Sequence, residues 1–385
     1  MKLSWPTKKL GEVCSLDRGT NPIHSSLFSK IKKSNYIRFV QLRDFETDNY
    51  VVYIPKNLKI TISNKDDSIV ALSGATAGKV VMGVEGAINS ALLRIRPLDS
   101  NILNKSFLHY FLLFSQKSLS RLGRGGAQPN ISKRDVAKIK IPIPPLSIQR
   151  KIVERLDAIK RAQELNDKQI ALADELFQSL LRQELDPKGK NWGEKKLGEI
   201  CEKITDGTHK TPRYIEKGIP FLSVKNVRED SIDFKDIKYI SIEEHKELIK
   251  RCRPRKNDIL YTKVGTVGIA KTIEKDKEFS IFVSVALLQP KLNLIIPKFL
   301  EFVLNSHIGR NQAHFYVKGI GVPDLHLVEI KKFKIPLPPI KTQQKIVEKL
   351  SAVQEYKKKL LEQEALLKEL FESVLNKSMK GELIK

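Results

Sequence analysis

The sequence predicts an α/β protein of the α+β kind, in which two homologous, strand-rich domains are separated by two long helices that form an antiparallel coiled coil. Three observations support this fold class. A segment of 22 residues returns at a constant offset of 194 residues, short alternating apolar runs fill the remainder of each copy, and a seven-residue apolar repeat follows each segment. A duplicated chain of this kind is expected to have pseudo-twofold symmetry.

The repeat extends along the whole chain. "KIKIPIPPLSIQRKIVERLDAI" (138–159) returns as "KFKIPLPPIKTQQKIVEKLSAV" (332–353), and "WPTKKLGEVC" (5–14) returns as "WGEKKLGEIC" (192–201). "GGAQPNISKRDV" (125–136) aligns with "GIGVPDLHLVEI" (319–330). We therefore divide the chain into a first domain, a central helix, a second domain and a C-terminal helix, with the limits 1–142, 143–188, 189–336 and 337–385.

The two domains are predicted to contain more strand than helix. Apolar runs of four to six residues are bounded by Gly, Pro, Asn and Asp, which is typical of strands joined by turns. The clearest strands are expected within 35–42, 67–74, 219–227 and 257–265. One helix is expected in each domain, over 104–122 and over 296–312.

The stretch 147–185 contains few Gly or Pro residues and is predicted to be a single helix, with a second copy near the C-terminus. Pro144 and Pro145 end the incoming strand, and Ser147 is the expected N-cap. Each helix of roughly 38 residues would be about 57 Å long. Gln163 and Asn166 would lie at mid-length, where a polar pair can fix the register of a coiled coil. The apolar positions expected to face the partner helix are Ile152, Leu156, Ile159, Ile170, Phe177, Ile346, Leu350, Val353, Leu360 and Phe371.

The charge of the chain favours a polyanionic partner. Lys and Arg number 69 against 44 Asp and Glu, a formal net charge of +25. Residues 1–142 hold 23 basic and 10 acidic residues, and residues 192–336 hold 27 and 19, so most of the excess lies in the two domains. Lysine and arginine side chains that neutralise phosphates release counterions, which makes nucleic acid the expected ligand of the domains.

Other features of the composition exclude several classes of protein. No apolar run approaches the roughly 20 residues of a membrane helix, so no membrane partner is expected. The three cysteines, Cys14, Cys201 and Cys252, are scattered, which indicates reduced thiols in a cytoplasmic protein and no zinc site.

No catalytic motif is evident either. "GATAGK" (74–79) has the wrong spacing for a phosphate-binding loop. In place of Asp324, Glu329 and Lys331 of "PDLHLVEIK" (323–331), the first copy has Asn130, Asp135 and Ala137, which cannot bind a metal alike. We expect a chain that is not an enzyme and binds no metal.

Together these segments resemble the DNA-specificity subunit of type I restriction–modification systems. The doubled strand, Pro-Pro and helix motif is the most specific sign, supported by "LDRGTNP" (16–22) beside "TDGTHKTP" (205–212). The resemblance implies two target recognition domains, each reading one half of a bipartite, asymmetric DNA sequence, and helices that set the unread gap and dock the methyltransferase subunits. It also implies partners that perform the catalysis: two methyltransferase (modification) subunits that use S-adenosylmethionine, and restriction/translocase subunits that use ATP and Mg.

Loop residues near the shared motifs are the candidate DNA contacts. Lysine and arginine on phosphates position a protein, whereas bidentate Arg–guanine and Asn or Gln–adenine pairs select sequence. The candidates are Arg18, Thr20, Asn21, Gln41, Arg43, Thr76 and Lys79 in the first domain, and Thr208, His209, Lys210, Arg213, Lys225, Asn226, Lys263 and Thr266 in the second.

Three other interpretations stay open at this point. The chain could be a specificity subunit of a related restriction system that is not type I. It could be a basic coiled-coil scaffold that binds nucleic acid without sequence preference. It could also be an enzyme whose catalytic motif is unfamiliar.

Overall fold

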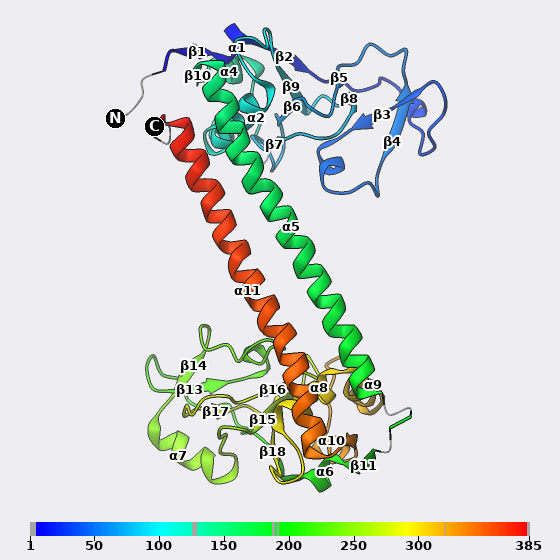
Figure 1. Ribbon diagram of the computed structural model, residues 1–385, viewed down its shortest axis with the longest axis vertical. Helices are drawn as coiled ribbons and strands as arrows, with labels where there is room; N and C mark the ends of the chain where they lie inside the picture. Colours follow the sequence, from blue (N-terminus) through cyan, green and yellow to red (C-terminus); the bar gives the residue numbers. More distant parts are fainter. Residues whose placement is uncertain (1–4, 125–128, 187–188, 191, 320, 383–385) are drawn as a thin grey trace. The chain divides into compact units, whose positions relative to one another are not determined.

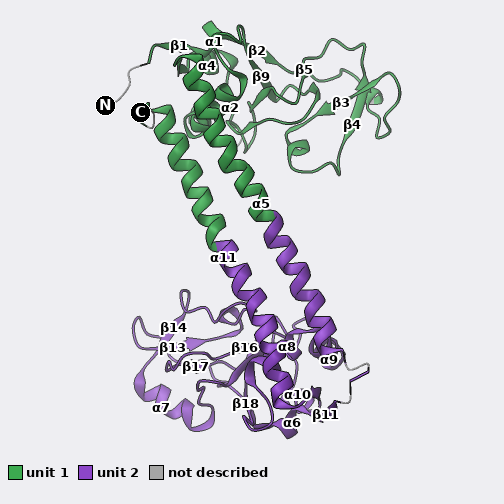
Figure 2. Cartoon of the chain, in the orientation of Figure 1, with its two compact units in different colours: residues 1–167, 362–385 green, residues 168–361 purple. Residues whose placement is uncertain are grey.

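A computed structural model describes residues 5–124, 129–186, 189–190, 192–319 and 321–382. The chain divides into two compact units, residues 1–167 with 362–385 and residues 168–361 (Figure 2). Each unit holds one globular domain and part of each long helix. The compact units thus combine segments that are distant in sequence.

The first domain is built on two four-stranded sheets. One has the order β2-β9-β6-β7, the other has the order β4-β3-β8-β5, and β1 pairs with β10. The strands are β1 (Thr7–Lys9), β2 (Cys14–Arg18), β3 (Tyr36–Val40), β4 (Val52–Pro55), β5 (Ile62–Ser63), β6 (Ser68–Ala71), β7 (Val80–Val81), β8 (Gly86–Ile88), β9 (Leu92–Pro97) and β10 (Lys140–Pro142). The short helices are α1 (Leu10–Val13), η1 (Ser25–Leu27), η2 (Leu42–Phe45), α2 (Lys105–Phe114), α3 (Gln116–Ser120) and α4 (Lys133–Ala137).

The second domain repeats this plan. Its sheets have the orders β12-β18-β15-β16 and β14-β13-β17, and β11 pairs with β19. The strands are β11 (Gly193–Lys196), β12 (Cys201–Asp206), β13 (Ile219–Leu222), β14 (Lys238–Ile240), β15 (Ile259–Thr262), β16 (Ala270–Thr272), β17 (Ser280–Ile281), β18 (Val285–Pro290) and β19 (Lys334–Leu337). The short helices are α6 (Leu197–Ile200), η3 (Val224–Asn226), α7 (Ile242–Arg251), α8 (Pro297–Asn305), α9 (His307–Tyr316) and α10 (Leu327–Ile330). The predicted duplication is confirmed, with one difference: β5 of the first domain has no counterpart strand in the second, where α7 lies between β14 and β15.

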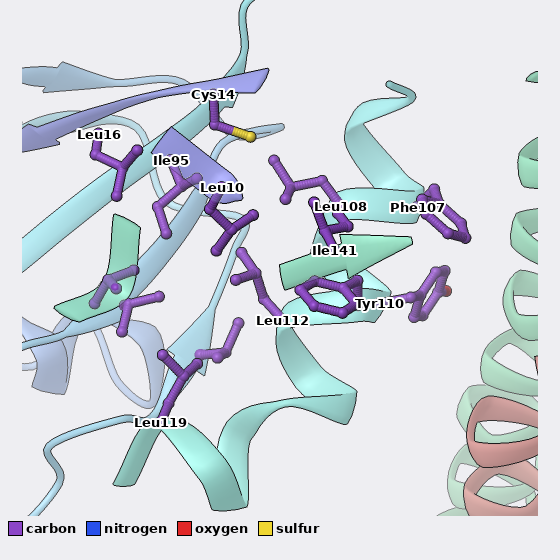
Figure 3. Close-up of a cluster of buried hydrophobic side chains, with 14 of the residues drawn as sticks. Leu10, Cys14, Leu16, Ile95, Phe107, Leu108, Tyr110, Leu112, Leu119 and Ile141 are labelled. Atoms are coloured by element: carbon purple, nitrogen blue, oxygen red, sulfur yellow. The ribbon is translucent and has the colours of Figure 1, made fainter. Parts of the chain in front are cut away.

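Each domain has its own apolar core. The inner strands β6 and β15 are buried at every position, as expected for a continuous apolar run covered on both faces. In the first domain, side chains from β2, β9 and α2 meet in this core (Figure 3). Burial raises the pKa of the Cys14, Cys201 and Cys252 thiols to about 12, so each cysteine is a protonated, apolar part of its core.

The two long helices are α5 (Leu146–Leu185) and α11 (Ile340–Met379), and they run antiparallel in each unit (Figure 1). In the first unit Gln163 Nε2 donates to the Leu367 carbonyl at 3.2 Å. In the second unit Lys349 Nζ lies 2.7 Å from Glu184 Oε1, and Lys357 also pairs with an acidic residue of α5. The predicted polar residues lie at mid-helix as expected, with Asn166 only 2% exposed.

The start of α5 differs from the prediction. The helix begins one residue before Ser147, and the Pro145 carbonyl accepts from the backbone N–H groups of Ile148 and Gln149. Ser147 therefore lies in the first turn, and its assignment as the N-cap is wrong. The second copy begins in the same way, with Pro339 in the place of Pro145.

The predicted heptad positions are all buried or half-buried. Ile152, Leu156, Ile346, Leu350 and Leu360 are at most 3% exposed, and Ile159, Ile170 and Val353 are half-buried. Phe177 and Phe371 also contact an aromatic ring of their own unit's globular domain: the ring centroids of Phe177 and Phe302 of α8 are 5.9 Å apart, and those of Phe371 and Tyr110 of α2 are 6.1 Å apart. These two phenylalanines hold the domains on the helices.

Each helix predicted inside a domain is interrupted by a serine. Ser115 separates α2 from α3, and Ser306 separates α8 from α9. The Ser306 hydroxyl accepts the Ile308 N–H and so caps the second helix. Helix α7 is an addition to the helices expected in the second domain.

Candidate nucleic-acid interface

Three loops that carry predicted contacts leave the first domain at one edge. Strand β2 ends at Arg18 and β6 ends at Ala71, and both ends lie opposite the start of β9. Strand β3 ends at Val40, which pairs with the last residue of β8. Since only a short segment joins β8 to β9, the loops after β2, β3 and β6 emerge side by side.

The segment between β8 and β9 binds all three loops through its backbone. The Asn89 N–H donates to the carbonyl of Val40, the last residue of β3, at 3.1 Å. The Gly19 N–H donates to the carbonyl of Leu92, the first residue of β9, at 3.0 Å, and the Leu72 N–H donates to the Ala91 carbonyl at 2.7 Å. Because these hydrogen bonds join backbone atoms only, they hold the loops in place whichever side chains the loops carry.

The second domain builds the same edge. Strands β12 and β15 end opposite the start of β18, and β13 ends opposite the end of β17. Phe282 N–H donates to Leu222 at 2.9 Å, Val283 N–H to Thr208 at 3.0 Å, and Lys263 N–H to the Ser284 carbonyl at 3.0 Å. We call the set of loops after β2, β3 and β6, or after β12, β13 and β15, the loop edge of each domain.

A glycine is required where the first loop crosses this segment. A Cβ atom on Gly19 would lie 2.1 Å from the Asn89 carbonyl oxygen, and one on Gly207 would lie 1.9 Å from the Ile281 carbonyl oxygen. No other residue fits such an approach without displacing backbone. This explains the glycine shared by "LDRGTNP" and "TDGTHKTP".

A fourth loop joins each edge. Gly74 N–H donates to the Pro129 carbonyl at 3.1 Å, and Gly265 N–H donates to the Pro323 carbonyl at 2.9 Å. The aligned prolines of the two copies thus lie against the glycine turns that follow β6 and β15. Residues 125–128 of the first motif and residue 320 of the second lie outside the described residues.

The fourth loop adds two cations that sequence reasoning missed. Arg124 forms a two-way backbone bridge with Asn130, and Lys318 forms the equivalent bridge with Asp324. Their side chains are 86% and 65% exposed. The aligned prolines could have identified these two cations, because in both copies a basic residue lies six positions before the bridge partner.

The comparisons with known proteins agree with this duplicated arrangement. The sequence matches the type I restriction modification DNA specificity domain twice, over residues 2–173 and 189–370. The chain belongs to this family. Each match takes in one domain and most of the long helix that follows it.

Relatives match over nearly the whole chain. The EcoBI specificity subunit of Escherichia coli is 24% identical over 99% of this chain and 86% of its own length, and the EcoKI subunit of E. coli K12 is 23% identical over 98% and 89%. The S subunit structure from M. genitalium covers 97% of this chain and 96% of its own, with a TM-score of 0.59 at 15% identity. A chain from a structure of a type I restriction–modification system reaches a TM-score of 0.66 at 20% identity, covering 98% of both chains. The structures share the fold of this chain.

Most predicted contacts lie on the surface of the specificity domains. Exposed candidates are Arg18, Thr20, Asn21, Arg43 and Thr76 in the first domain and His209, Lys210, Arg213, Lys225 and Thr266 in the second. Gln41, Lys79 and Thr208 are half-buried.

Several of these side chains have intramolecular partners. Both Arg18 and Asn21 bind the backbone of Ser90, at 2.7 Å and 3.0 Å. Arg43 lies over the Tyr50 ring, 5.1 Å from its centroid. Lys79 pairs with Glu46 and lowers the pKa of that carboxyl. Contacts of this kind orient the loops and leave the remaining donors available for a ligand.

Two candidates require correction. Asn226 is 5% exposed, and its side chain donates to the carbonyls of Asp233 and Asp236 and accepts the Ser223 N–H. Lys263 is 4% exposed and lies among carboxylates. Both side chains face the interior of the second specificity domain, so neither is placed to reach a base.

The described residues contain no group of three or more His, Cys, Asp or Glu side chains that could hold a metal ion. Nor is any helix in the described part of the chain long and apolar enough to cross a membrane.

Proposed function

We propose that each specificity domain reads one half of a bipartite, asymmetric DNA sequence through its loop edge. The observation that carries this proposal is the convergence of the separately predicted loops at one edge of each domain, built twice with the same backbone hydrogen bonds. Family membership and the net charge of +25 support it.

The cations and the amide and hydroxyl groups would have different roles. Exposed lysines and arginines such as Lys210 and Arg124 would bind phosphates and set the orientation of each domain. Exposed side chains that an intramolecular contact orients, Arg43 over Tyr50 and Asn21 on the Ser90 backbone among them, would contact base edges, where a good bidentate pair is worth about 1–3 kcal/mol. Each half-site would then depend on its own domain only.

The long helices would set the distance between the half-sites and dock the methyltransferase subunits. Each helix has 40 residues and would be about 60 Å long at 1.5 Å per residue. At about 3.4 Å per base pair, that length corresponds to at most roughly 17 base pairs.

Catalysis would belong to the partners of this chain in the cytoplasm. Two methyltransferase subunits with S-adenosylmethionine would modify the DNA, and restriction/translocase subunits with ATP and Mg would move and cut it. The chain itself would contribute the sequence preference.

The proposal can be tested by selecting duplexes from a random DNA pool with the full chain and any subunits that copurify. We expect two short blocks with a fixed unread gap. Arg43→Ala should relax only the first-domain block, and Lys225→Ala only the second-domain block. No enrichment would favour a charged scaffold without sequence preference, and one continuous block would also contradict the proposal.

A further inference from the structure

A buried lysine of the second specificity domain stands where the first has a leucine. Leu72 N–H donates to the segment before β9, and its carbonyl accepts from Ile131 of the fourth loop. Lys263 makes the same two backbone hydrogen bonds, with Ser284 and Leu325. The two positions are therefore structurally equivalent.

The lysine side chain joins two loops of the edge. Lys263 Nζ lies 3.7 Å from Asp206 Oδ2, at the start of the first loop, and 3.6 Å from Asp324 Oδ1, in the fourth loop. Asp206 is only 3% exposed, and Asp324 Oδ1 is buried with no hydrogen-bond partner among the described residues. Lys263 thus balances both carboxylates.

Two further side chains, both exposed, contact the same carboxylate. Asp206 also pairs with Arg251 at 2.5 Å and with His209 at 3.4 Å. Arg251 ends α7, and in the first domain the fully described segment between β4 and β6 has strand β5 instead of a helix. The network therefore belongs to the second domain alone.

The first domain shows that this network is not needed to build the edge. Arg18, Leu72 and Asn130 occupy the positions of Asp206, Lys263 and Asp324, and the same backbone hydrogen bonds form around them. A buried ion pair is costly to desolvate, and an apolar residue of similar size often stabilises a fold as well or better. A lysine at this position is therefore better explained by a role in placing the loops than by stability.

We propose that Lys263 is a positioning residue of the second specificity domain. It clamps the loop that carries Thr208, His209 and Lys210 to the fourth loop, which carries Lys318, so that both present their contacts in one arrangement. This inference rests on the proposed function and deepens it: preference for the second-domain half-site depends on the Lys263 charge, whereas preference for the first-domain half-site does not.

The test compares four full-length proteins in the random-pool selection, each with its copurifying subunits. They are the wild type, Lys263→Arg, the charge-balanced double variant Lys263→Met with Asp324→Asn, and Leu72→Met as the matched control in the first domain. Thermal unfolding of each protein is measured in parallel. The double variant removes one cation and one carboxylate, so it leaves no added repulsion.

We expect the double variant to keep the first-domain block within about twofold and to lose about tenfold or more of its preference in the second-domain block, equivalent to about 1.4 kcal/mol. Lys263→Arg, which retains the cation, and Leu72→Met should keep both blocks. A general structural defect would instead weaken binding to both halves alike.

Other outcomes overturn the inference. Two unchanged blocks from a folded double variant would contradict the clamp and leave the proposed function intact. Unfolding of the double variant would show that the ionic network serves folding. Absence of both blocks with the wild type would overturn the proposed function, and the inference with it.

Discussion

A buried glutamine connects each specificity domain to the start of its long helix. Gln149 is fully buried, its Nε2 donates to the carbonyls of Ile102 and Pro144 at 2.8 Å, and its Oε1 accepts the Asn104 N–H at 2.8 Å. Gln343 makes the equivalent three hydrogen bonds in the second unit. A glutamine is therefore required here because its buried amide satisfies two acceptors and one donor of the backbone at once.

We expect Gln343→Leu to destabilise the second unit by roughly 3 kcal/mol or more, because three buried backbone groups would each lose a partner worth about 1–3 kcal/mol. Urea unfolding measures the change. The neighbouring Gln344 is exposed, so Gln344→Leu should change stability by less than about 0.5 kcal/mol. Equal effects of the two substitutions would contradict the assigned hydrogen bonds.

His109 predicts a pH dependence of the first unit. Burial, with a smaller contribution from Lys160, lowers the pKa of this histidine to about 4 from its usual 6.5. The unfolded chain then binds the proton more readily than the folded one as the pH falls below 6.5, so stability decreases toward pH 4. From pH 7 to pH 5 the loss should be about 2 kcal/mol.

His109→Gln should remove this loss, as measured by the difference between wild-type and variant urea midpoints at the two pH values. His245, whose pKa burial also lowers, is present in both proteins, so its contribution cancels. An identical pH dependence of the two proteins would show that His109 is not buried in its neutral form.

At the residue scale, the sequence located the loops but not the direction of every side chain. Arg18 and Arg43 were predicted as contacts and are exposed. Lys263 and Asn226 carry the same polar chemistry, yet both face inward: Lys263 toward carboxylates distant in sequence, and Asn226 toward backbone carbonyls of the turn that follows it. A spacing pattern contains no information about such partners.

At the element scale, long periodic segments were predicted well and short ones less well. The predicted helix 147–185 is observed as Leu146–Leu185, because a heptad pattern over five turns or more has few alternatives. The breaks at Ser115 and Ser306 were missed, since a serine is compatible both with a helix interior and with a cap. Whether each serine lies inside a helix or caps one is decided by the packing of α2 and α8 against their sheets.

The glycine crossing is an element-scale test of the loop edge. In Gly207→Ala the added Cβ would meet backbone at 1.9 Å, so the loop after β12 must shift away from the segment before β18. We expect about tenfold or greater loss of preference for the second-domain half-site, or about 1.4 kcal/mol, with the first-domain half-site retained.

Gly193→Ala is the matched control, because no atom lies within 4 Å of the added Cβ. Pool selection of both variants measures the preference. A Gly207→Ala protein with an unchanged second-domain block would mean that the loop after β12 takes no part in recognition.

At the scale of the whole molecule, duplication explains why so much was predictable. Two copies of each motif gave two independent signals for the same strand, turn or helix, and the family match covers both copies. Differences between the copies, such as α7 and the Lys263 network, had no such support. They are also the features that can give the two domains different preferences.

The role of the helices as a spacer gives the last prediction. Seven added residues lengthen a helix by about 10.5 Å, close to the rise of about three base pairs. A heptad inserted after Asp167 in α5 and a matching heptad after Leu361 in α11 keep the apolar faces of both helices in phase. We expect the random-pool selection to return both original half-sites with a gap longer by about three base pairs.

A heptad in α5 alone places apolar positions of one helix against the wrong partners in the other, so recognition of the paired half-sites should be lost. A changed half-site after the matched insertion, or a gap of the original length, would show that the helices do not set the distance between the sequences that the two domains read.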